Sequence, residues 1–202
     1  PEGFLRAIEE IAYTGGANNS YETIKLAEDK VIRQILVRGY QDGYEPWYNL
    51  AEVRLDENNL QRIPFEFTNL EDYYRMMKAQ WPLITLTVAV APLTTGNIYY
   101  FPMTDYYAGI VLIGLGGAET AYINAASARG GKYALISSSN NNQLGLAHGY
   151  LPWHCVQFPM GLQDDIEDWY DPMGKSPKLR LRVASGGTGC DVAVVLEQLE
   201  RY

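Results

Sequence analysis

Alternation of apolar and polar residues recurs along most of this chain and predicts short β-strands joined by turns. Residues 23–40 show the alternation twice, on either side of a charged turn at 28–30. Residues 50–67 show it again around a polar turn, and further strand-like segments follow from residue 83 to the end, separated by turns rich in Gly, Asn and Thr. About a dozen short strands without an alternating βαβ rhythm predict an all-β sandwich or barrel.

The first segment, "GFLRAIEEIAY", departs from this alternation and predicts a helix. Its apolar residues have the spacing of one helix face: Phe4, Leu5, Ile8, Ile11 and Ala12. A stretch of turn formers, "TGGANNS", follows. We therefore expect residues 1–20 to form a short amphipathic helix with a flexible arm, and residues 21–202 to form the body. The helix would either pack on its own domain, or dock on a neighbouring subunit or a membrane surface.

A second helix is predicted near residues 69–80. Thr68 and Glu71 have the spacing of a capping box, and Pro82 ends the helical pattern. The expected apolar face packs across the end of a sheet.

The stretch "VLIGLGGAET" resembles a nucleotide-binding turn but lacks its spacing. Glu119 stands where a dinucleotide fingerprint needs its third glycine, and the residues that follow alternate as in a strand. We interpret the glycines as a bend between two strands and expect no cofactor.

Composition indicates a folded protein and argues against nucleic-acid binding. The chain has 202 residues, of which 47% are hydrophobic, so one domain can bury a substantial core. The formal net charge of −8 disfavours a phosphate-binding face. Cys155 and Cys190 have no metal or redox spacing, and we expect both to be reduced. Because no basic and apolar leader precedes the first strand-like segments, we expect the chain to stay in the compartment where it is made.

Residue patterns that carry catalysis are missing from the sequence. His148 and His154 are its two histidines, and they lack the spacing and adjacent carboxylate of a cupin metal site. Cys155 follows His154 directly, so on a strand the two side chains would point to opposite faces. We therefore expect no metal and no catalytic residues.

Two charged segments are candidates for contacts with other chains. Residues 164–171 gather five acids around Trp169, which suits a solvated loop, a subunit contact anchored by the tryptophan, or a cation site. On the strand "KLRLRV", Lys178, Arg180 and Arg182 share one face. That basic stripe is either an ordinary exposed strand face or a surface for an acidic neighbour.

The order of elements resembles the upright jelly-roll capsid proteins of tailless icosahedral viruses, the membrane-containing phages and archaeal viruses related to the adenovirus hexon lineage. The resemblance rests on the strand pair "IKLAEDKVIRQILVRGY", a second pair followed by a helix, a long β half, and the closing "LRLRVASGGTGCDVAVVLEQLERY". It implies a jelly-roll β-sandwich. The strand count favours a single roll with additions, and a compact double roll is the alternative.

The resemblance also implies a function and partners. It implies a structural, non-enzymatic protein of the virion capsid, made in the host cytoplasm, that self-assembles into capsomers. Its partners would be copies of itself and a sister capsid protein, with the N-terminal arm in contact with an internal membrane and no direct contact with nucleic acid. Expected subunit contacts are Phe4, Leu5, Ile8, Ile11, Trp169, Lys178, Arg180 and Arg182.

Two other functions share the predicted architecture. A carbohydrate-binding β-sandwich would also be acidic and rich in aromatic residues, and would use Trp47, Tyr48, Trp153 or Trp169 as stacking platforms. A cupin-like enzyme would share the roll but needs a metal cluster.

Overall fold

The chain folds into two compact units, one inserted into the other in sequence. The structure, a computed structural model, describes residues 3–41, 44–90, 97–100, 103–104, 107–112, 132–135, 143–152 and 154–202. Unit 1 comprises residues 1–41, 46–77 and 155–202, and unit 2 comprises residues 42–45 and 78–154. Both ends of the chain therefore belong to unit 1.

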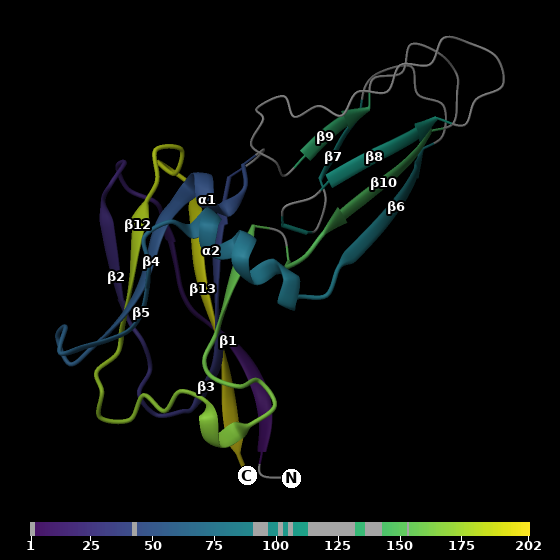
Figure 1. Cartoon of the computed structure of the whole chain (residues 1–202). Coiled ribbons are helices and arrows are strands. Elements are labelled where there is room, and N and C mark those ends of the chain that lie inside the picture. The colour runs from purple at the N-terminus through teal and green to yellow at the C-terminus, as the bar shows by residue number, and fades with distance from the viewer. Residues whose placement is uncertain are drawn as a thin grey trace. The chain divides into compact units, whose positions relative to one another are not determined.

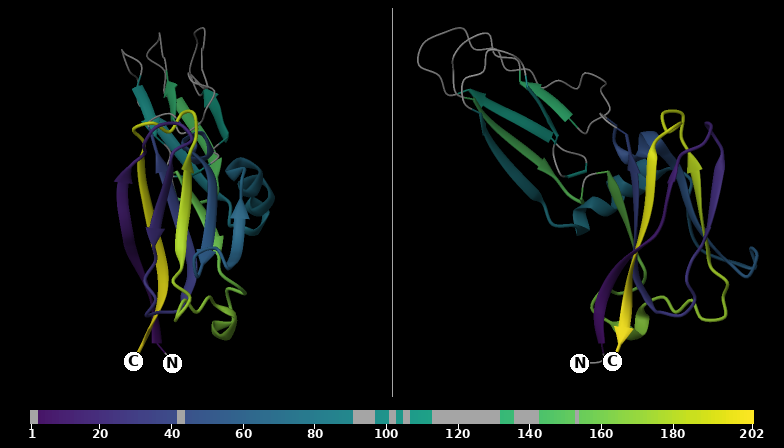
Figure 2. Two further views of the ribbon diagram at one scale, coloured as in Figure 1. Left: turned by 90° about the vertical axis from the view of Figure 1, so that its left-hand side faces the viewer. Right: turned by 180° about the vertical axis from the view of Figure 1, so that it is seen from behind.

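Unit 1 is a sandwich of two four-stranded antiparallel sheets (Figures 1 and 2). Sheet A has the order β1 (Gly3–Thr14), β13 (Asp191–Arg201), β3 (Ile32–Tyr40) and β11 (Cys155–Pro159). Sheet B has the order β2 (Tyr21–Lys25), β12 (Lys178–Val183), β4 (Leu50–Glu57) and β5 (Arg62–Phe67). The predicted all-β sandwich is confirmed.

Strand alternation builds the core between the two sheets. Along β12, half-buried and buried residues strictly alternate, because every second side chain points to the facing sheet. Sheet A contributes Ile35, Val37, Val194 and Leu196, and sheet B contributes Val53, Leu55, Leu179 and Leu181, all of them fully or almost fully buried.

The predicted N-terminal helix is wrong, because Gly3–Thr14 is strand β1. This strand pairs with β13 from Gly3–Arg201 to Thr14–Asp191, with a β-bulge between Glu9 and Ile11. The bulge adds one residue, so Ile8 and Ile11 both lie on the inner face although they are three residues apart. A bulged strand therefore has the spacing that we interpreted as helical, and residues 3–14 belong to the sandwich instead of forming an arm.

The predicted helix near 69–80 is confirmed as α2 (Leu70–Met77), followed by the 3₁₀ turn η1 (Lys78–Gln80). Its cap differs from the prediction, because Asn69 Oδ1 accepts hydrogen bonds from the backbone N–H groups of Glu71 and Asp72. Two further short helices, α1 (Pro46–Asn49) and the 3₁₀ turn η2 (Ile166–Asp168), have no counterpart in the sequence prediction.

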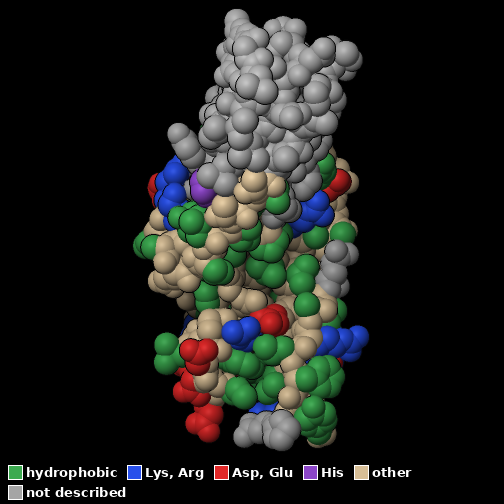
Figure 3. Space-filling view, turned by 90° about the vertical axis from the view of Figure 1, so that its right-hand side faces the viewer, with side chains coloured by type: hydrophobic (Ala, Val, Ile, Leu, Met, Phe, Trp, Pro, Cys, Tyr) green, Lys and Arg blue, Asp and Glu red, His purple; other side chains and the backbone are tan. Residues whose placement is uncertain are grey.

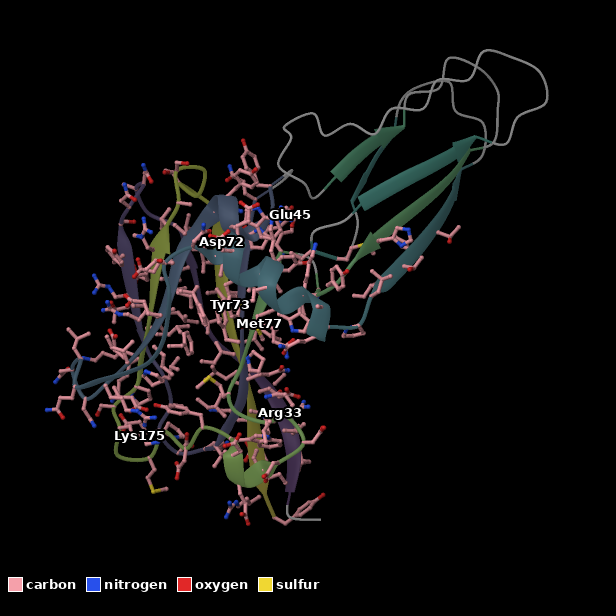
Figure 4. The ribbon with its side chains drawn as sticks, viewed as in Figure 1. Arg33, Glu45, Asp72, Tyr73, Met77 and Lys175 are labelled. Atoms are coloured by element: carbon pink, nitrogen blue, oxygen red, sulfur yellow. The ribbon has the colours of Figure 1, made fainter. Side chains whose placement is uncertain are left out.

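An aromatic cluster connects the two sheets at their β11 and β5 edges. Phe158 on β11 stacks on Phe65 of β5 at 5.4 Å and on Tyr73 of α2 at 4.8 Å between ring centroids. The Tyr73 hydroxyl donates to the Gln157 carbonyl at 2.8 Å (Figure 4). The helix α2 therefore packs at the edges of the two sheets, where the prediction had placed it across a sheet end.

Unit 2 contains the remaining described strands. β6 (Ile84–Val90), β10 (Gln143–Gly149) and β8 (Tyr107–Leu112) form one antiparallel sheet, and β7 (Asn97–Tyr100) pairs with β9 (Lys132–Leu135). Strands were predicted in each of these segments. The glycine bend at 114–117 and the strand-like segment at 119–126 lie outside the described residues.

Candidate interaction surfaces

The predicted basic stripe lies on one face of β12, on the outer side of sheet B, and each of its members contacts a neighbouring strand or loop. Lys178 donates to Asn59 at 2.8 Å, and the Arg180 guanidinium lies 3.9 Å from the ring centroid of Tyr21. Arg182 donates to Glu52 at 3.0 Å. The stripe is therefore engaged within its own chain, and its role in a subunit contact stays a prediction.

Acidic residues of β4 complete a charged network beside this stripe. Arg54 lies 2.7 Å from Asp56 and 3.3 Å from Glu66, and the hydrogen bond that Arg54 donates to Asp56 raises the pKa of Arg54. Glu52 and Asp56 are both 6% exposed, so neighbouring arginines, and not water, compensate their negative charges. Sequence reasoning missed this network, although the alternating charges of 52–56 were its signal.

Trp169 is packed inside unit 1, at 9% exposure. Its indole N–H donates to the Leu162 carbonyl at 2.9 Å, and the Arg33 guanidinium lies 5.7 Å from its ring centroid (Figure 4). Within the acidic run, Asp168 accepts from the Leu162 N–H at 2.6 Å and Asp165 from the Glu167 N–H at 3.1 Å. The tryptophan thus fixes its own loop, which the sequence did not predict, and the acids shape turns.

Glycine is required where this loop begins. Gly161 has a φ of +89°, and a Cβ built there would lie 2.1 Å from the Asp168 carbonyl oxygen. The turn that brings Leu162 back to Asp168 and Trp169 therefore depends on a residue without a side chain.

One carboxylate binds two cations at the end of sheet A where both chain ends lie (Figure 1). Glu200 Oε1 accepts from Lys30 and, at 3.3 Å, from Arg6. These cations hold the pKa of Glu200 below its ordinary value, with the hydrogen bond from Lys30 as the largest cause. A cleft of about 340 Å³ adjoins the group and is lined by Asp171, Met173 and Leu199 among others.

The outer face of sheet A differs from that of sheet B, because small and aliphatic side chains make up much of its centre, beside Arg38. The register places Ala12, Ala193 and Arg38 side by side, and Val195 beside Leu36 in the next row. Figure 3 looks onto this side of unit 1, where hydrophobic side chains surround a pair of opposite charges. Arg33 and Glu197, 3.1 Å apart, form an ion pair on this sheet.

A shallow hollow of about 310 Å³ lies on this face where β1, β13 and β3 run side by side. Ala12 and Ala193 line it together with Thr14, Asp191 and Arg38. The Arg38 guanidinium lies 4.8 Å from the Tyr40 ring centroid. The Arg38 side chain borders the hollow beside the two alanines. The sequence shows no pattern that predicts the hollow, because it depends on the register of three distant strands.

The four apolar residues predicted as contacts in the N-terminal segment divide between two environments. Phe4 and Leu5 are 51% and 42% exposed, and the Phe4 ring lies 6.1 Å from that of Tyr202. Ile8 and Ile11 are half-buried, opposite the core residues Leu196 and Val194. Phe4 and Leu5 are thus available for an intermolecular contact.

Neither thiol forms a disulfide bond, and both are poorly reactive near neutral pH. Burial raises the pKa of Cys155 to about 11 and also raises the pKa of Cys190. Among the residues that the structure describes, three or more His, Cys, Asp or Glu side chains nowhere gather as a metal site would need.

The two histidines lie outside the sandwich. His148 and His154 belong to unit 2, and the His148 ring lies 3.3 Å from the Thr85 hydroxyl. No helix in the described part of the chain has the length and apolar character to span a membrane.

Comparisons with family models, curated proteins and solved structures found no match to this chain.

Proposed function

We propose that this protein is a structural capsid protein whose body is a single jelly roll, and that it self-assembles into capsomers of an icosahedral shell. The observation that carries the proposal is the pairing of the eight strands of unit 1. The first strand pairs with the last, β1 with β13, and the second with the second to last, β2 with β12. The third and sixth, β3 and β11, and the fourth and fifth, β4 and β5, complete the series.

This nested series is what results when one long antiparallel hairpin is wrapped into two sheets. Alternate pairs then fall in opposite sheets, which agrees with β1–β13 and β3–β11 in sheet A and β2–β12 and β4–β5 in sheet B. Eight strands in two four-stranded sheets make one jelly roll, a fold common in viral capsids. Unit 2 would then be a long insertion between the fifth and sixth strands of the roll, and a double roll would need eight further strands of this kind.

The two outer faces of the sandwich support a role in assembly. The face of sheet B carries charges that are paired within the chain. The face of sheet A is largely small and aliphatic, and interface centres are depleted in charged residues. The Arg33–Glu197 ion pair on this sheet is satisfied within the chain, so a second copy that packs there need not supply a partner for it. The internal membrane contact implied by the resemblance has less support, because it relied on an N-terminal helix and Gly3–Thr14 is a strand.

The two rival functions have less support. A sugar-binding site needs exposed aromatic platforms. Trp47 and Trp169 are both buried, Tyr48 is half-buried, and Trp153 lies outside the described residues. A cupin-like metal site needs histidines inside the roll, and the sequence of unit 1 contains none.

The first test measures the native mass of the purified protein over a concentration series, by light scattering, with electron microscopy of the same samples. We expect discrete oligomers of capsomer size, then curved sheets or shells as concentration rises. A strict monomer at every concentration that also binds a glycan array would contradict the proposal and favour a carbohydrate-binding module.

A further inference from the structure

The free edge of β1 is the longest open strand edge of unit 1. β1 has twelve residues and pairs with β13 alone among the strands that the structure describes. The opposite edge of sheet A is β11, which has five residues. Unpaired backbone N–H and C=O groups along an edge are a template for pairing with another chain. The long edge of β1 is therefore a place where a second sheet can be added.

A protruding side chain and a hollow lie at opposite ends of this edge, on the same face. Leu5 shares the outer face with Ala7 and Ala12, because the bulge at residue 10 shifts the alternation by one position. Leu5 is 42% exposed near the start of β1, whereas the hollow of about 310 Å³ over Ala12 and Ala193 lies near its end. Antiparallel pairing of two β1 strands brings the start of one to the end of the other, so the leucine of each copy faces the hollow of the other.

Charge on the same face also favours the antiparallel arrangement. Asp191 and Arg201 are both exposed and lie at opposite ends of β13, on the outer face by register. In an antiparallel pair Asp191 of one copy and Arg201 of the other lie in the same row, three strand spacings or about 14 Å apart, whereas a parallel pair would place like charges in one row. Thr14 and Gly3 lie between the two charges in that row, beside Asp191 and Arg201 respectively.

We infer that two copies of this chain associate through antiparallel pairing of their β1 strands about a two-fold axis, with Leu5 of each copy in the Ala12–Ala193 hollow of the other. The bulge interrupts the edge, so the pairing involves two segments, residues 3–6 of one copy against 11–14 of the other and the reverse. Such an isologous contact forms each interaction twice and closes on itself. The inference rests on the proposed function, since it names the contact through which assembly begins.

The test is a cysteine cross-link between two different variants of the full chain. Leu5→Cys and Ala12→Cys chains are mixed under mild oxidation, since residues directly opposite on paired strands have Cβ atoms about 4.5–5.5 Å apart, near disulfide reach. We expect a disulfide-linked heterodimer from the mixture and none from either variant alone. A mixture of Leu60→Cys and Ala12→Cys is the matched control, because Leu60 is 57% exposed but lies in the β4–β5 turn of sheet B.

A second measurement covers the case in which the cysteines disturb folding. Leu5→Asp should weaken self-association on the order of tenfold or more in sedimentation, whereas Leu60→Asp should leave it unchanged. Equal cross-linking of the control mixture, or unchanged association of a folded Leu5→Asp chain, would overturn the β1 contact. If the wild-type chain forms capsomers or shells but the mixture of Leu5→Cys and Ala12→Cys chains gives no cross-link, the β1 contact fails while the proposed function stands. A wild-type chain that stays monomeric overturns both.

Discussion

Glu200 illustrates how a single surface carboxylate makes the stability of the fold depend on pH. Lys30 and Arg6 both bind it, and they lower its pKa in the folded state. A group with a depressed folded pKa contributes stability above its unfolded pKa, and this contribution is lost as the pH falls through the folded pKa. The window is therefore the acidic range at and below the ordinary glutamate pKa of about 4.3.

Replacing the principal cation tests this linkage. In Lys30→Met we expect the Glu200 pKa to rise toward its ordinary value, because the donor of its main hydrogen bond is gone. Unfolding free energies measured by urea denaturation at neutral pH and near pH 3 should then differ less than in the wild type. Lys178→Met is the control, because Lys178 donates to the neutral Asn59. An identical pH dependence in Lys30→Met and wild type would show that the pair does not contribute.

At the scale of elements, the aromatic cluster between β11, β5 and α2 determines how the two sheets are held at their open edges. Phe158 is 1% exposed and stacks on three rings, those of Phe65, Phe67 and Tyr73. Phe158→Ala should lower the free energy of unfolding by about 3–5 kcal/mol, since it removes buried area and leaves a cavity. Denaturant unfolding followed by tryptophan fluorescence measures the loss.

Two substitutions separate volume from ring stacking in this cluster. Phe158→Leu keeps most of the apolar volume and should cost about 1–2 kcal/mol. Phe65→Ala, at a half-buried ring on the facing sheet, should cost less than Phe158→Ala. If Phe158→Ala were as stable as the wild type, the cluster would not hold the sheet edges together.

Strand elements with simple alternation were predictable from sequence, and β1 was not. In β12, alternate residues 179, 181 and 183 are buried, so a period of two in the sequence matches the structure. In β1, the bulge between Glu9 and Ile11 places Ile8 and Ile11 on one face, which is also what a helix does. Local spacing cannot distinguish these cases, because pairing with β13, nearly two hundred residues away, selects the strand.

The candidate surfaces were predictable only in part, for a similar reason. The basic stripe on β12 followed from alternation, but its pairing with Glu52 depends on the register between β12 and β4. Trp169 was expected on the surface, yet its N–H reaches Leu162 because Gly161 turns the chain back on itself. The hollow beside Ala12 requires three strands in register. Each of these features combines residues that only the folded chain brings together.

At the scale of the whole molecule, the nested strand pairs make unit 1 complete without the inserted residues. Each of its eight strands pairs with other strands of the same unit, and both ends of the chain lie in sheet A. We therefore expect that replacing residues 78–154 with a short Gly/Ser linker leaves a folded sandwich. The shorter connection also lowers the entropy cost of joining α2 to β11, by about 0.6 kcal/mol for each halving of a flexible loop.

The excised chain should keep one cooperative thermal transition in circular dichroism, with a β-type spectrum. The matched control removes residues 78–159, which also deletes β11 and with it Phe158. That chain should not fold, because sheet A loses an edge strand and the aromatic cluster loses its central ring. If both deletions unfold alike, unit 1 depends on the insertion, and the eight strands do not form an autonomous sandwich. If only the control unfolds, the excised chain should still self-associate through sheet A. The native mass of the excised chain would then show whether the insertion takes part in self-association.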